Sequence, residues 1–171
     1  MRSVGQQTAS EGQQVGRVED TMPAVVQHTY GSPDVLELQQ VSRPTVGDDD
    51  VLIRVRAAGV HIGDWHLMTG QPYLMRIMGF GLRAPKTRTQ GTDVAGTVES
   101  VGKNVTRFSI GDEVFGTCDG SFAEYATARV DTLALKPANL TFEQAATLPT
   151  SACTALQALR DAGGSSRVSR S

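Results

Sequence analysis

The sequence predicts a mainly β fold with a few short helices, arranged as a barrel or a sandwich. Three observations lead to this class. The chain of 171 residues holds 18 glycines and 7 prolines, which favours many turns and short strands over long helices. Apolar and polar residues alternate in several short segments, as they do in half-buried strands. Aromatic residues make up only 5%, so Val, Leu, Ala and Ile must fill most of the core.

Seven short strands are predicted. The clearest is 51–55, where Val51, Ile53 and Val55 point to one face while Arg54 and Arg56 point to the other. Glycines at strand ends and bends, from Gly91 to Gly116, suit positive φ or close backbone approach rather than phosphate binding. The predicted strands are 24–28, 35–41, 51–55, 94–101, 113–115, 121–128 and 132–135.

Two helices are predicted to close the chain. Thr141 and Gln144 have the spacing of a capping box, in which the threonine caps the helix and the glutamine bonds back to it. That helix should end near residue 148. A second helix over 151–162 places Ala152, Leu156 and Leu159 on one face. The flanking segments 1–21 and 163–171 are polar and without pattern, so both are predicted to be disordered.

Composition excludes several classes of partner. Sixteen basic and 18 acidic residues give a net charge of −2, so no nucleic-acid partner is expected. No apolar run approaches the ~20 residues of a membrane helix, so no membrane partner is expected either. Two distant cysteines, Cys118 and Cys153, are interpreted as buried small hydrophobic residues of a reduced, cytoplasmic protein.

Residues 91–116 carry a resemblance to a known family. They read GTDVAGTVESVGKNVTRFSIGDEVFG, which resembles the signature of the medium-chain dehydrogenase/reductase superfamily. Segments 31–68 and 120–159 are similar to the start and end of the same domain. The resemblance implies a GroES-like, partly open barrel over 22–150, the catalytic domain, and a connecting helix over 151–162. The nearest branch contains zinc-independent quinone oxidoreductases and NADPH-dependent reductases.

The resemblance also implies a second domain, a doubly wound (Rossmann) dinucleotide-binding fold with a glycine-rich phosphate turn. In relatives it would begin just after residue 162. Here the sequence continues as a short polar tail. We therefore expect a chain truncated before the cofactor domain and inactive by itself.

Zinc-dependent members of the superfamily hold a catalytic zinc ion on three side chains. The resemblance places His61, Thr92 and Thr150 at these three positions. Threonine is a poor zinc ligand, so we expect no metal site.

The resemblance places four residues in or near a catalytic cleft. His61 falls beside the nicotinamide and the substrate, and Thr154 approaches the cofactor. Asp64 either orients His61 or Thr92, or caps a short helix that follows it. Tyr73 or His61, or a water molecule held by them, is the candidate proton donor. For Thr154 the alternative is a hydrogen bond to its own helix backbone.

Two further histidines, His28 and His66, are interpreted as surface or satisfied residues. The segment 71–89 resembles a substrate-side loop. Its four basic residues form either a solvated face or a contact with an anionic group of cofactor or substrate. These four are Arg76, Arg83, Lys86 and Arg88.

These features predict the catalytic half of an oxidoreductase that uses NADPH or NADH to transfer hydride to a quinone, an enone or another carbonyl compound. A non-enzymatic barrel remnant that acts only by association is one alternative. A zinc alcohol dehydrogenase relative that has lost its metal is the other. We also expect self-association through the apolar helix face, which the absent domain would otherwise cover.

Overall fold

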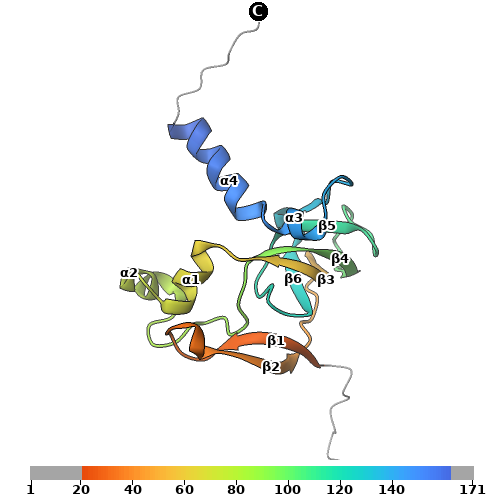
Figure 1. The fold of residues 1–171 in the computed structure, drawn as a ribbon. Helices are drawn as coiled ribbons and strands as arrows, with labels where there is room; N and C mark the ends of the chain where they lie inside the picture. Colours follow the sequence, from red (N-terminus) through yellow and green to blue (C-terminus); the bar gives the residue numbers. More distant parts are fainter. Residues whose placement is uncertain (1–20, 163–171) are drawn as a thin grey trace, which may run out of the picture.

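A computed structural model describes residues 21–162 and confirms the mainly β class (Figure 1). The strands are β1 (Thr21–Gln27), β2 (Leu36–Ser42), β3 (Asp50–Gly59), β4 (Asp93–Val101), β5 (Glu113–Thr117), β6 (Tyr125–Arg129) and β7 (Leu133–Leu135). The helices are α1 (Ile62–Thr69), α2 (Tyr73–Met75), α3 (Phe142–Ala146) and α4 (Pro149–Gln157), with helical turns η2 (Pro33–Val35), η3 (Arg76–Phe80), η4 (Val130–Thr132) and η5 (Ala158–Ala162).

The strands form two antiparallel sheets. The larger has the order β6-β3-β4-β5-β7, and β1 and β2 form a separate hairpin. Isolated bridges from Ala24 to Ala123 and from Val26 to Thr89 connect the hairpin to the loops of the larger sheet. The two sheets do not close on each other, so the predicted partly open barrel is confirmed.

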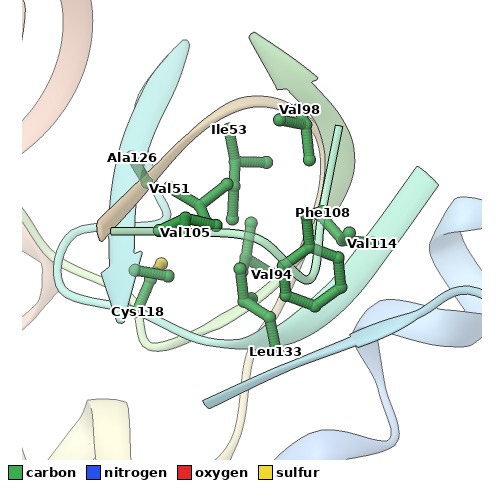
Figure 2. Close-up of a cluster of buried hydrophobic side chains, with 11 residues drawn as sticks. Val51, Ile53, Val94, Val98, Val105, Phe108, Val114, Cys118, Ala126 and Leu133 are labelled. Atoms are coloured by element: carbon green, nitrogen blue, oxygen red, sulfur yellow. The ribbon is translucent and has the colours of Figure 1, made fainter. Parts of the chain in front are cut away.

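The core lies inside the curved five-stranded sheet and is mainly aliphatic, as predicted. Val51 and Ile53 of β3 are fully buried, and Leu52 between them is buried as well. Arg54 and Arg56, which were predicted to face away from the core, are exposed. Figure 2 shows Val51 and Ile53 meeting Val94 from β4 and Phe108 from the following loop. The alternation in the sequence therefore identifies the buried face of β3 correctly.

Two of the glycines show why the strand ends need this residue. Gly91 adopts φ +91°, a left-handed conformation that favours glycine. Gly96 lies so close to β3 that a Cβ atom there would collide with the carbonyl oxygen of Arg54. Their prediction as structural rather than phosphate-binding glycines fits both positions.

Several predicted boundaries were wrong. The strand expected at 121–128 begins only at Tyr125, because the amides of Ser121 and Phe122 bond back to the carbonyl groups of Gly91 and Gln90. The last helix begins at Pro149 rather than 151, since proline suits the first turn of a helix. Residues 1–20 and 163–171, predicted to be disordered, lie outside the described residues, and β1 already includes Thr21.

α4 projects away from the rest of the domain in Figure 1. Every residue from 151 to 161 is exposed, including Leu156 (53%) and Leu159 (68%). Neither leucine packs inward on the barrel. The apolar face predicted for this helix is therefore open to solvent, as expected.

We expect the chain to self-associate through this face, and Leu156→Glu or Leu159→Lys to reduce the association without lowering the melting temperature. A charge at these positions stays in water, so it carries no burial cost. Light scattering and thermal melts measure the two effects. A wild-type chain that remains monomeric at high concentration contradicts the prediction.

Candidate active site

The candidate site forms where the central strand pair ends. β3 and β4 run antiparallel, and Gly59, the last residue of β3, pairs with Asp93, the first of β4. The residues that follow β3 therefore lie beside the residues that precede β4. This register brings His61 and Thr92 together although 31 positions separate them in the chain.

His61 is fixed by the start of α1. Its Nδ1 atom accepts a hydrogen bond from the Gly63 amide (2.9 Å) and caps the helix. Because Nδ1 accepts, the proton of the neutral ring lies on Nε2. Nε2 lies 2.7 Å from the Thr92 hydroxyl, so His61 donates this bond and Thr92 Oγ1 accepts it.

Asp64 completes the capping arrangement. Its Oδ2 atom accepts a hydrogen bond from the His61 amide (2.9 Å) and lies 3.8 Å from His61 Nε2. The alternative in which Asp64 caps a following helix was wrong: His61 is the cap, and Asp64 is the third residue inside the helix. Asp64 is buried, and its Oδ1 atom has no partner among the described residues.

A second carboxylate links the site to α4. Asp93 is 2% exposed, and its two oxygens accept hydrogen bonds from the Thr150 hydroxyl (2.6 Å) and the Thr150 amide (3.2 Å). One turn further along α4, the Thr154 hydroxyl donates to the Thr150 carbonyl (2.7 Å). Thr154 is exposed. Its bond to the helix backbone is the alternative role that was predicted for it.

Two cavities meet at Thr92. One, of about 240 Å³, lies between α1 and the segment 85–92 and has Tyr30, Leu67 and Pro85 in its wall. The other, of about 540 Å³, is more open and is lined by His61, Thr92, Cys118 and Thr150, among others. The Thr92 side chain is therefore placed to contact a molecule in either cavity.

The remaining predicted residues lie apart from this pair. Tyr73 on α2 is 67% exposed and lines neither cavity. Its proposed role as proton donor stays a prediction without support from this geometry. His66 bonds to the Gln71 carbonyl (2.7 Å), and His28 contacts Gln39 (3.3 Å). Both histidines match their interpretation as satisfied residues.

Two features of the site were missed by the sequence analysis. Thr92 was considered as a lost metal ligand and as a residue that Asp64 could orient, but not as the hydrogen-bond partner of His61, and the bond between Asp93 and Thr150 was not foreseen. Both contacts depend on the register of β3 and β4 and on the position of α4. The alternation in each strand could have suggested that the strands pair, but not the register.

The two cysteines differ in environment. Cys118 is buried, and burial together with the nearby Asp119 and Asp93 carboxylates raises the pKa of its thiol to about 12. Cys153 on α4 is exposed, so its interpretation as a buried residue was wrong. The reason is that α4 carries it away from the core.

No cluster of three or more His, Cys, Asp or Glu side chains suited to a metal ion occurs among residues 21–162. At the three positions implied by the resemblance, the His61 and Thr150 side chains are already engaged by neighbours. Within the same residues, no helix has the length and apolar character needed to cross a bilayer.

Comparison with known proteins agrees with the fold. Residues 47–138 match the alcohol dehydrogenase GroES-like domain. The quinone oxidoreductase of Sus scrofa is 38% identical over 130 residues, covering 74% of this chain and 37% of that protein. The 2-methylene-furan-3-one reductase of Solanum lycopersicum is 37% identical over 148 residues, covering 80% and 36%. A mycobacterial structure in complex with NADPH superimposes with a TM-score of 0.73 at 29% identity, covering 86% and 43%.

The chain thus belongs to the alcohol dehydrogenase GroES-like family, in the quinone oxidoreductase-like branch of the medium-chain dehydrogenase/reductase superfamily. Its curated relatives named above are an oxidoreductase and a reductase, and two of the solved structures similar to it hold NADPH. The chain spans about two fifths of the length of the relatives it matches.

We expect the purified chain to hold well under one zinc ion per molecule. Zinc binding at the implied position would have to break the bonds from His61 Nε2 to Thr92 and from Thr150 to Asp93. Metal analysis by mass spectrometry after dialysis against a chelator gives the stoichiometry. Zinc that is stoichiometric and resists the chelator contradicts this expectation.

We also expect the two thiols to react at very different rates with a disulfide reagent. Cys153 is accessible and should react in the folded chain. Cys118 stays protonated at pH 8, because its thiolate forms only as the pH approaches its raised pKa of about 12. Cys153→Ser should remove the fast reaction and Cys118→Ser should leave it. Two fast thiols in the folded wild-type chain would contradict the assignment.

Proposed function

We propose that this chain supplies the substrate-side wall of an NADPH-dependent oxidoreductase that transfers hydride to a quinone, an enone or another carbonyl compound in the cytoplasm. The names of the relatives support this choice, since one is a quinone oxidoreductase and the other reduces a ketone that bears an adjacent methylene group. The hydrogen bond from His61 to Thr92, at the border of the two cavities, is the observation that carries the proposal.

The donor set suits a nicotinamide and a carbonyl substrate. The more open cavity is lined by threonine hydroxyl groups, the His61 imidazole, two carboxylates and one guanidinium group, and the hydroxyl and imidazole groups can hydrogen-bond to the amide and ribose hydroxyl groups of a nicotinamide nucleotide. When bound, the cofactor supplies the hydride. His61 lines this cavity and is the residue that would contact the nicotinamide. Thr154 lines neither cavity, and its contact with the cofactor rests on the family resemblance alone.

Thr92 has the geometry to stabilise the substrate oxygen. The Thr92 oxygen accepts a hydrogen bond from His61 Nε2, so the Thr92 hydroxyl can donate its own hydrogen bond to a carbonyl oxygen in the cavity. Negative charge grows on that oxygen as hydride adds to the substrate, and a fixed donor stabilises it. The neutral His61 ring holds Thr92 in place but does not give up its proton, so a water molecule supplies the proton that completes the reduction.

We expect nicotinamide mononucleotide to bind the chain weakly at this site. In an amide NMR titration, shifts should concentrate at Gly63, Thr92 and Thr117, which border the more open cavity or hold His61. Thr92→Val removes one hydrogen-bonding group and should weaken binding by about fivefold. Thr106→Val, at an exposed position, is the matched control.

The outcome that contradicts the proposal is the absence of shifts at saturating ligand, or shifts remote from these residues. Steady NADPH oxidation by the chain alone is not expected. No glycine-rich turn leading into a helix N-terminus, which binds cofactor phosphates in other folds, occurs within residues 21–162.

A further inference from the structure

Three apolar side chains of the helical segment formed by α2 and η3 are turned toward solvent. Leu74, Ile77 and Met78 are 62%, 72% and 72% exposed. They are spaced three and four positions apart, so they share one side of the helix. A surface helix of a water-soluble domain has the reverse arrangement, with its apolar side against the core.

The basic side chain of this segment instead attaches it to the domain. The guanidinium group of Arg76 stacks over the Tyr30 ring at 4.2 Å and donates hydrogen bonds to the carbonyl groups of Gly70 (2.9 Å) and Thr69 (3.0 Å). Tyr30 also donates to the Gly81 carbonyl (2.8 Å). These contacts at both ends of the segment hold its apolar side toward solvent.

Charge is distributed unevenly around the same segment. All 18 acidic residues of the chain lie outside 65–92, whereas four of its 16 basic residues lie within it. Arg83, Lys86 and Arg88 are exposed. Trp65 (45% exposed) and Tyr73 (67% exposed) belong to the same stretch. We call the exposed apolar, aromatic and basic residues of this stretch the cationic–apolar surface: Trp65, Tyr73, Leu74, Ile77, Met78, Leu82, Arg83, Lys86 and Arg88.

We propose that the cationic–apolar surface docks on the face of a lipid bilayer that contains anionic lipids. Apolar side chains enter the boundary between headgroups and acyl chains, aromatic rings lie at headgroup level, and basic residues attract the anionic lipids. A second copy of this surface would bring like charges together. No membrane partner was expected from the sequence, because no apolar run in it is long enough to span a bilayer, but surface docking needs no such run.

Vesicle flotation tests the proposal with the 171-residue chain. Flotation separates bound protein from aggregates, which do not rise with the lipid. We expect the chain to float with vesicles of phosphatidylcholine and phosphatidylserine at low salt, and less with phosphatidylcholine alone or at high salt. Trp65 is the single tryptophan of the chain, so its emission should shift to shorter wavelength on binding.

Two double variants separate the apolar and the charged contributions. Leu74→Glu with Ile77→Glu should abolish flotation, whereas Leu38→Glu with Ile110→Glu, at positions 77% and 71% exposed, should leave it unchanged. Arg83→Gln with Lys86→Gln should weaken binding roughly thirtyfold, because each basic residue near an anionic surface contributes about a factor of five. Lys103→Gln with Arg160→Gln is the control for charge.

Three results overturn the proposal. The first is the absence of flotation with anionic vesicles at low salt. The second is an equal loss of binding in the control variants. The third is a change in oligomeric state, rather than in flotation, when Leu74 and Ile77 are replaced, which would show that a second copy covers the surface. Unchanged thermal melts of all four variants confirm that each remains folded.

Discussion

The antiparallel pairing of β3 with β4 is the constraint on which the rest of the structure depends. β3 is hydrogen-bonded to β6 on one side and to β4 on the other, so it anchors the larger sheet. Gly59 lies opposite Asp93. A Cβ atom on Gly59 would collide with the carbonyl oxygen of Ala146 at the end of α3. The same pairing therefore lets α3 pack closely on the sheet and places the residues after β3 against those before β4.

Asp93 connects this pairing to the arm formed by α4. A buried carboxylate is costly unless hydrogen bonds compensate it, and the Thr150 amide and hydroxyl provide two. The bond to the amide also satisfies a donor at the start of α4, which has no side-chain cap. Because Thr92 directly precedes Asp93, the orientation of α4 and the position of the candidate donor hydroxyl depend on two consecutive residues at the start of β4.

Patterns within a short stretch of sequence predicted the structure of that stretch well. They did not predict contacts between distant residues, because those contacts depend on the register of the strands. Alternation identified the buried face of β3, and the spacing of Thr141 and Gln144 predicted a capping box that the structure contains. Asp64 was one candidate for the cap of the helix after β3, because aspartate is a preferred cap. The structure uses His61, whose ring needs the space left by glycine: a Cβ atom at Gly63 would lie 2.8 Å from Nδ1. The bond from His61 to Thr92 required the strand register, which one sequence does not reveal.

The segment 71–89 takes part in two of the features described above. It contributes Arg76, Gly79 and Lys86 to the wall of the smaller cavity, which Thr92 also borders. It also carries eight of the nine residues of the cationic–apolar surface, and Lys86 belongs to both features. Arg76 lines the cavity, and its contacts with Tyr30, Gly70 and Thr69 also hold the segment that carries the docking surface. A molecule bound in the cavity and a membrane docked on the surface would therefore contact the same short segment. If the chain acts on quinones as proposed, docking would bring this cavity close to the bilayer, in which apolar substrates dissolve, because Lys86 belongs both to the cavity wall and to the docking surface. Vesicle flotation tests the docking surface, and the nicotinamide titration tests the reaction site, so the two proposals can fail independently. An apolar substrate would nevertheless explain why an enzyme of this kind docks on a bilayer.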